Sequence, residues 1–314
     1  MYIVTGAAGF IGSHIVKELN SRGINSIIAV DSLGSDDKFL NLCDCTISDY
    51  LDASEFSELI KSGKLGKIDA IFHQGACSDT TEADGKFMML NNFTYTKNII
   101  NFAAAKEIPL VYASSAATYG ASSSFKEIPE NEKPLNVYGY SKLAADQYLR
   151  SVIDKIDSTV VGLRYFNVYG QRETHKGKMA SMVYQLYRQI RTTGKAKLFE
   201  GTEGYGPGEQ RRDFVYVKDV VSVNLFFGLS DKVNKGIVNC GTGKSRSFND
   251  IANTLINING AGVIEYVPIP ESIKSKYQSF TQADLEGLRR LGCNINFHKL
   301  EEGIRECFDE WNKN

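Results

Sequence analysis

The chain of 314 residues carries 36 basic and 37 acidic side chains, a formal net charge of -1. This balance, with no long run of either sign, gives no electrostatic reason to expect nucleic acid or an anionic membrane as a partner. Hydrophobic residues make up 42% of the chain, enough for one large domain or two smaller ones. No apolar run could cross a bilayer and the first ten residues do not resemble a secretory signal, so we expect a cytoplasmic protein.

Short β-rich segments alternate with amphipathic helical segments along the first half of the chain. The pattern predicts strands at residues 2–6, 27–31, 68–73 and 109–115, and helices at 10–23, 53–62, 86–106 and from about 138. Repeated β-α units favour a parallel sheet with helices on both faces. The sequence therefore predicts an α/β, Rossmann-type doubly wound fold.

The alternation weakens in the second half. Residues 159–168 predict one more buried strand, and residues 201–213 predict an exposed loop rich in glycine and charge. Two later segments, 213–228 and 236–243, predict a strand and a helix that return to the first domain. The later segments predict a smaller lobe of helices and short strands. We expect a dinucleotide-binding domain of residues 1–166 plus about 214–242, and a second α/β lobe of about 167–213 plus 243–314, which would bind substrate.

The six cysteines show neither Cys-x-x-Cys pairs nor a metal-ligand spacing with the four histidines. We therefore expect free thiols and no metal site.

Three glycines follow the first predicted strand at the start of the first predicted helix. Gly6, Gly9 and Gly12 form G-x-x-G-x-x-G, which lets backbone N–H groups and the helix N-terminus approach a pyrophosphate closely. Asp31 ends the next strand 22 residues after Gly9, where an acid that contacts a ribose is expected. This context predicts a dinucleotide site.

The choice between NAD and NADP stays open at this level. The Asp31 carboxylate favours NAD, because it accepts hydrogen bonds from free ribose hydroxyls and repels a 2′-phosphate. Lys38, in the following loop, could reach that phosphate.

A second group of polar residues follows the strand at 109–115. Ser114 and Ser115 end this strand, at the edge of the sheet where open α/β folds bind ligands. Tyr138 and Lys142 are four residues apart and share a helix face, whereas Tyr140 points elsewhere. A nearby ammonium favours the phenolate, so we expect a lowered pKa and a base at Tyr138.

The glycine turn, the serine and the Tyr-x-x-x-Lys pair, in this chain order, resemble the extended short-chain dehydrogenase/reductase superfamily. Within it, YASSAATYG, RYFNVYG, HKGKMAS, RRDFVYV and FTQADL are similar to the family of ADP-L-glycero-D-manno-heptose 6-epimerases, over nearly the full chain. The resemblance implies inversion of carbon 6 of ADP-D-glycero-β-D-manno-heptose, for the heptose of the lipopolysaccharide inner core. It further implies transient oxidation to a ketone and re-reduction with tightly bound NADP, with NAD as the other possibility, and a homo-oligomer, pentameric in this family.

The resemblance also implies roles for individual residues. Tyr138 and Lys176 would be the two acid/base groups on opposite faces of the ketone, and Ser115, rather than Ser114, would hydrogen-bond the reacting oxygen. Lys142 would hold the nicotinamide ribose and tune Tyr138, and Tyr140 would pack or contact the cofactor at its periphery. The implied cofactor-binding residues are Gly6, Gly9, Phe10, Ile11, Gly12, Asp31, Ser32, Lys38, Gln74, Gly75, Ala76, Cys77, Ser78, Asn91, Lys142, Val168 and Lys176.

The implied substrate-binding residues are Asn167, Lys178, Gln185, Phe199, Glu200, Gly201, Thr202, Arg212 and Tyr277. Lys178 and Gln185 replace a small polar residue and a histidine of the family pattern, and the loop 203–210 is longer than in that pattern. We therefore expect the contacts to the sugar to differ from the family pattern, whereas all the catalytic residues of that pattern are present.

Three other functions compete with this interpretation. A UDP-hexose 4-epimerase would use the same serine, tyrosine and lysine but would not need Lys176. A 4,6-dehydratase would carry an acidic pair directly after Ser115, where the chain has Ala116 and Ala117. A non-catalytic dinucleotide sensor could dispense with Tyr138 and Lys142.

Overall fold

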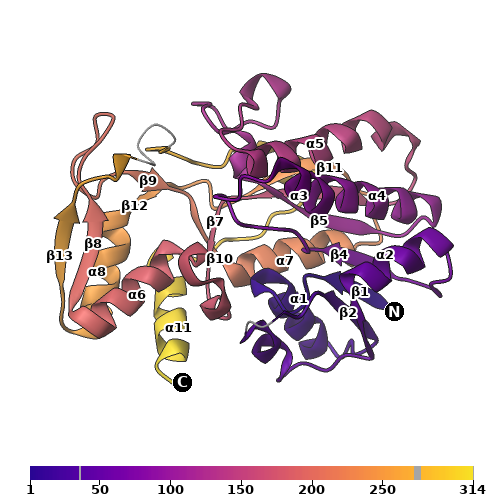
Figure 1. Cartoon of the computed structure of the whole chain (residues 1–314), viewed down its shortest axis with the longest axis horizontal. Helices are drawn as coiled ribbons and strands as arrows, with labels where there is room; N and C mark the ends of the chain where they lie inside the picture. Colours follow the sequence, from indigo (N-terminus) through magenta and orange to yellow (C-terminus); the bar gives the residue numbers. More distant parts are fainter. Residues whose placement is uncertain (35–36, 272–276, 314) are drawn as a thin grey trace.

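A parallel sheet of seven strands forms the centre of the computed structural model, which describes residues 1–34, 37–271 and 277–313 (Figure 1). The strand order β11-β6-β5-β4-β1-β2-β3 is that of a doubly wound sheet, and every pair in it is parallel. This confirms the predicted Rossmann-type fold. The strands are β1 (Tyr2–Thr5), β2 (Ile27–Asp31), β3 (Asp49–Asp52), β4 (Ala70–His73), β5 (Leu110–Ser115), β6 (Val160–Tyr165) and β11 (Lys235–Cys240).

Helices cover both faces of this sheet because the strands are apolar on both sides. In β1, Val4 packs in one core with α1 (Phe10–Ser21) and α7 (Val217–Gly228), while Ile3 faces the opposite core. That second core is closed by α2 (Ala53–Ser62), α4 (Tyr95–Ala105) and α5 (Val137–Val152). The carboxyl ends of the strands are left for loops and for a ligand.

The second half forms a smaller group of elements, drawn at the left of Figure 1. Its core is built mainly by α6 (Met182–Thr193), α8 (Phe248–Asn259) and α11 (Leu300–Trp311). β8 (Lys195–Phe199) pairs with β13 (Val263–Val267), and β9 (Arg211–Arg212) pairs with β12 (Arg246–Ser247). α10 (Glu286–Arg290) instead lies beside β11, and its Leu288 is buried in the core of the main sheet. The division into two domains with the stated boundaries stays a prediction.

Several predicted elements were wrong in detail. The strand β3 was missed, since an edge strand of composition DYLD, half exposed and with two aspartates, lacks the apolar signature of a strand. The single helix predicted at 86–106 consists of α3 (Gly85–Met88), the π-helical segment η2 (Met89–Thr94) and α4. The wider turn buries Asn92, which bonds the backbone N–H and carbonyl of Cys77, a long-range contact that periodicity does not reveal.

The strand predicted at 159–168 is split between two sheets. β6 ends at Tyr165, and β7 (Asn167–Tyr169) pairs with β10 (Phe214–Tyr216) in a sheet of its own, so β10 does not return to the main sheet as expected. The loop predicted at 201–213 is exposed for most of its length, but it ends in β9, where Arg212 is buried.

All six cysteines are free, as predicted. Within residues 1–34, 37–271 and 277–313, no group of three or more His, Cys, Asp or Glu side chains could hold a metal ion. Over the same residues, no helix combines the length and the apolar character needed to cross a membrane.

Candidate active site

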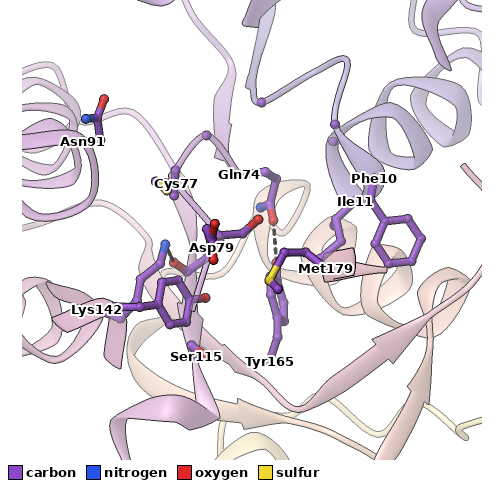
Figure 2. A pocket seen from close by; sticks show the side chains of 18 of the residues that line it. Phe10, Ile11, Gln74, Cys77, Asp79, Asn91, Ser115, Lys142, Tyr165 and Met179 are labelled. Atoms are coloured by element: carbon purple, nitrogen blue, oxygen red, sulfur yellow. Dashed lines mark hydrogen bonds between the residues drawn. The ribbon is translucent and has the colours of Figure 1, made fainter. Parts of the chain in front are cut away.

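A cavity of about 1320 Å³ lies at the carboxyl ends of the central strands and extends to the second group of elements. Its walls come from the glycine turn, the ends of β2, β4 and β5, helix α5 and the segment around Lys176. Figure 2 shows this cavity with Phe10, Gln74, Ser115 and Lys142 around it. Residues far apart in the sequence thus surround one space large enough for two nucleotides.

The glycine turn has the geometry that a pyrophosphate needs. Gly6 adopts φ +64, and Gly9 is the N-cap of α1 without a side-chain hydrogen bond to the helix and without an acid in the first turn. A Cβ on Gly12 would lie 2.7 Å from the carbonyl carbon of Gly6 and closer still to its oxygen. Only glycine lets the helix begin this close to the strand, and its free N–H groups and positive end suit an anion.

Asp31 and Lys38, which pointed to different cofactors, form an ion pair. Lys38 Nζ donates to Asp31 Oδ1 at 2.9 Å, and the same carboxylate accepts hydrogen bonds from the backbone N–H of Ala8 and of Ser32. Asp31 is buried at the end of β2. The carboxylate is therefore balanced by a cation at the position where a ribose is expected.

The loop after β4 forms a further wall. Gln74 to Ser78 line the cavity, and Gln74 is held by a hydrogen bond from the Tyr165 hydroxyl at 2.9 Å, drawn in Figure 2. Asn91 lines it from η2, and Val168 from β7.

Ser115, Tyr138 and Lys142 meet at the end of β5. Ser115 and Tyr138 both lie in the cavity wall, and the Ser115 hydroxyl acts to lower the pKa of Tyr138. Lys142, on the same face of α5 as Tyr138, donates from Nζ to the Ala113 carbonyl at 2.8 Å. Burial lowers the pKa of Lys142 to about 8. The neighbouring Ser114 is not equivalent, because its hydroxyl donates to Asp146.

The expected lowering of the Tyr138 pKa was wrong for this structure. Burial raises the pKa of Tyr138, and the neighbouring Ser115 hydroxyl acts in the opposite direction. The amine of Lys142 donates to a backbone carbonyl, which directs its hydrogen bond away from the phenol. Tyr140 points away from Tyr138 and Lys142, as predicted from the helix face: its side chain is 51% exposed and lies outside the cavity wall, so it does not pack into the site.

Lys176 reaches the cavity from the other side, in the segment η6 (Thr174–Met179). Its Nζ lies 5.2 Å from the centroid of the Phe10 ring, and burial lowers its pKa. The negative charge of Glu173 acts against this shift. Glu173 is itself fully buried and accepts hydrogen bonds from the backbone N–H of Gly170 and the hydroxyl of Ser181.

Arg212 is the buried cation at the far end of the cavity. Its guanidinium lies 5.2 Å from the centroid of the Tyr277 ring and 5.7 Å from that of Phe248. The Phe199 and Tyr277 rings are in contact, with centroids 5.8 Å apart. Tyr277 therefore adjoins Arg212 and Phe199 adjoins Tyr277, although neither belongs to the cavity wall.

The other predicted substrate residues are distributed unevenly. Asn167 lines the cavity. Outside its wall lie Lys178, Gln185, Glu200, Gly201 and Thr202. The Gln185 amide donates to the carbonyls of Lys178 and Ala180, so it stabilises the turn that precedes α6.

Sequence reasoning missed several residues of the wall. Met179 and Ser181 could have been predicted from the sequence, since they follow Lys176 in the HKGKMAS motif. Gln278 and Thr281 come from a later part of the chain; Thr281 lies within the FTQADL motif, but neither residue was assigned a role in the site.

Comparison with known proteins agrees with this geometry. A model of the NAD dependent epimerase/dehydratase family matches residues 2–241. The chain belongs to this family. It is 54% identical, over 98% of its own length and 97% of the relative's, to an ADP-L-glycero-D-manno-heptose-6-epimerase of Alkalilimnicola ehrlichii.

Solved structures of this family share the whole fold. The crystal structure of the Helicobacter pylori ADP-L-glycero-D-manno-heptose-6-epimerase superposes with a TM-score of 0.86 at 33% identity, covering 99% of this chain and 96% of that one. The Thermus thermophilus UDP-glucose 4-epimerase in complex with NAD gives 0.80 at 25% identity, over 99% and 98% of the two chains. These matches confirm the resemblance expected from the sequence.

Proposed function

We propose that the protein is an isomerase that converts ADP-D-glycero-β-D-manno-heptose to ADP-L-glycero-β-D-manno-heptose, which would supply the heptose of the lipopolysaccharide inner core. The observation that carries this proposal is the convergence of two proton-transfer groups, Tyr138 from α5 and Lys176 from η6, on one cavity. The 54% identity to a heptose 6-epimerase supports the substrate.

The residues present fit a nicotinamide dinucleotide. The N-terminus of α1 has no side-chain cap, a Cβ on Gly6 or Gly12 would overlap the backbone, and Asp31 and Lys38 pair at the end of β2, where we expect the adenosine ribose. When bound, the nicotinamide supplies reversible acceptance of a hydride, which an epimerase needs because the carbon 6 hydrogen is not acidic. Among the two dinucleotides we propose NADP, since Lys38 offsets the charge of Asp31 and presents an ammonium to a 2′-phosphate.

Two side chains of the protein, Tyr138 and Lys176, then carry out the proton transfers on opposite faces of the sugar carbon. Ser115 and Tyr138 hold the carbon 6 oxygen on one face, and Tyr138 takes or returns its proton. Lys176 performs the same task when the opposite face is presented, which explains why a buried lysine faces the cavity. Arg212, buried against aromatic rings, would grip the diphosphate with its planar fork.

The first test is incubation of the purified protein with ADP-D-glycero-β-D-manno-heptose, without added cofactor, followed by NMR of the carbon 6 proton. We expect the L-glycero epimer to form. An unchanged sugar, even after NADP and NAD are added, would refute the heptose assignment. Conversion of UDP-glucose to UDP-galactose in the same assay would instead favour the UDP-hexose 4-epimerase.

The cofactor preference has its own test. The dinucleotide released on denaturation should be NADP, and Lys38→Ala should lower NADP affinity by roughly tenfold relative to NAD, the effect of losing one charge-assisted contact. Release of NAD alone, or an unchanged ratio of affinities in Lys38→Ala, would refute this part.

We also propose a homo-oligomer, a pentamer by family resemblance. Light scattering coupled to size exclusion gives the mass directly, and the mass of a single chain would refute it.

A further inference from the structure

Helix α5 is tied to the end of β5 by a residue beyond the Tyr-x-x-x-Lys pair. Asp146 lies one turn after Lys142, and its Oδ2 accepts a hydrogen bond from Ser114 Oγ at 2.9 Å. Ser114 stands between Ala113, whose carbonyl accepts from Lys142, and Ser115, which lines the cavity together with the candidate catalytic tyrosine. Three successive residues at the end of β5 (113–115) therefore lie against one face of α5. That face carries Tyr138, Lys142 and Asp146, which are four residues apart.

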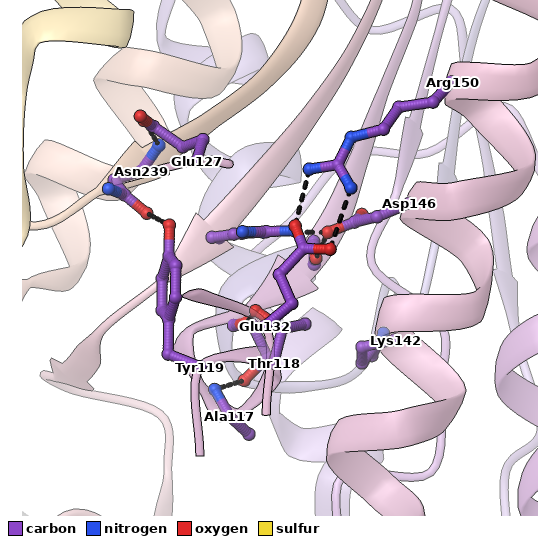
Figure 3. A network of polar contacts seen from close by, with 12 residues as sticks. Ala117, Thr118, Tyr119, Glu127, Glu132, Lys142, Asp146, Arg150 and Asn239 are labelled. Carbon is purple, nitrogen blue, oxygen red and sulfur yellow. Dashed lines mark hydrogen bonds and ion pairs between the residues drawn. The ribbon is translucent and has the colours of Figure 1, made fainter. Parts of the chain in front are cut away.

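Asp146 is held in place by further buried partners. Its carboxylate accepts from the Tyr112 hydroxyl at 2.8 Å and from Arg164 Nε at 2.9 Å, and both Asp146 and Arg164 are 0% exposed. Arg164 also pairs with Glu132, which in turn holds Arg150 (Figure 3). Figure 3 shows Lys142 one turn from Asp146 on the same helix.

Such a network has a use besides stability. A buried ion pair recovers little more than its desolvation penalty, and an apolar replacement of similar volume is often as stable. This network leaves Arg164 Nη1 without a hydrogen-bond partner, but its other bonds restrict the helix to one register and one distance from the strand. Here that register sets where the tyrosine hydroxyl and the lysine amine lie relative to Ser115.

We propose that Asp146, through Ser114, is a positioning residue that sets the geometry of Tyr138, Lys142 and Ser115. This inference rests on the proposed epimerase function. Asp146 does not itself line the cavity, but it accepts a hydrogen bond from Ser114, which does, so its effect is exerted through the neighbouring residues.

The charge of Asp146 adds a second effect that can be measured separately. Asp146 raises the pKa of Lys142, against the larger effect of burial. The other titratable groups that face this amine are Tyr138 on α5, Cys77 after β4 and His73 in β4. Loss of the Asp146 charge should lower the pKa of Lys142, so activity that needs the ammonium is lost at a lower pH.

The experiment compares Ser114→Ala and Asp146→Asn with the control Ser158→Ala in the intact protein. Ser158 is a buried serine whose hydroxyl donates to the Ile108 carbonyl, away from the cavity. The wild type must first convert the heptose; failure there refutes the proposed function and not this inference. Rates are then divided by the amount of bound nicotinamide, which counts folded enzyme only.

We expect both test variants to lower kcat by roughly 10-fold to 100-fold with KM within about twofold, as for a misplaced catalytic group. Ser158→Ala should match the wild type, and Ser114→Thr, which keeps the hydroxyl, should recover most of the activity. Asp146→Asn alone should move the basic limb of the kcat profile to lower pH.

Folded Ser114→Ala with wild-type kcat would overturn the proposal, as would a change in KM alone. If Asp146→Asn does not fold, the kcat of Ser114→Ala alone tests the proposal, because this substitution leaves every charge of the network in place.

Discussion

Replacement of Gly12 by alanine tests whether the close approach of helix α1 to strand β1 is as strict as the structure indicates. An added Cβ would lie 2.7 Å from the Gly6 carbonyl carbon and 3.1 Å from the Ala7 Cα, well inside normal contact. Both partners are backbone atoms of the turn, so no side-chain rotation relieves the overlap. Overpacking of this kind costs about 3 kcal/mol, at the upper end of the usual range.

A gain in helix propensity opposes this cost. Alanine is favoured over glycine inside a helix by about 1 kcal/mol, so the net destabilisation is about 2 kcal/mol. For a chain of this size that corresponds to a fall in Tm of about 3 °C. Dinucleotide binding should suffer as well, because relief of the overlap displaces the N–H groups of the turn.

The assay is thermal unfolding together with the dinucleotide content of the purified protein. The matched control is Gly66→Ala, since Gly66 has no atom within 4 Å of an added Cβ and its φ is not in the left-handed region. That variant should keep its Tm and its dinucleotide. A Gly12→Ala protein with wild-type Tm and full dinucleotide content would refute the steric argument.

Three further predictions concern proton transfer and pH. Tyr138→Phe should lower kcat by about 100-fold or more, the usual contribution of a general acid/base, while the protein keeps its dinucleotide. Glu173→Gln should lower the pKa of Lys176, because Glu173 raises it, and the basic limb of the kcat profile should move to lower pH. Burial lowers the pKa of His14 to about 4 and of His73 to about 3, below the unfolded value, so the unfolded chain binds more protons on acidification. Stability should be fully present above about pH 6.5 and fall by about 1.4 kcal/mol per pH unit for each histidine down to about pH 4.

The outcomes that contradict these predictions are equally direct. Tyr138→Phe with wild-type kcat in the heptose assay would remove the proposed base, and an unmoved pH profile in Glu173→Gln would separate Glu173 from Lys176. For the histidines, the measurement is denaturant unfolding at pH 7, 6 and 5, with His14→Gln as the variant. If that variant is as sensitive to acid as the wild type, His14 does not contribute.

Local patterns were sufficient for the alternating elements and for much of the site. The turn from Gly6 to Gly12 and the spacing of Tyr138 and Lys142 are short-range signals, because backbone geometry and helix periodicity act over a few residues. The family resemblance extended the prediction to Lys176, which the structure places at the cavity.

Other features needed the folded chain. The sequence left Asp31 and Lys38 as competing indications, and only the end of β2 and the loop beyond it show that they pair. The π-helical turn at η2 and the edge strand β3 depend on contacts made across the sheet, so their local composition predicted a plain helix and no strand.

The sequence alone determined a doubly wound dinucleotide fold with a serine, a tyrosine and a lysine at one sheet edge. The tertiary structure decided that the Ser114 hydroxyl donates to Asp146, where the Lys142 amine donates, and that Asp146 and Arg164 are buried together. The physical reason is the distance along the chain over which each interaction acts. Periodicity records which face of an element is apolar, whereas the partner of a buried charge is set by how distant elements pack.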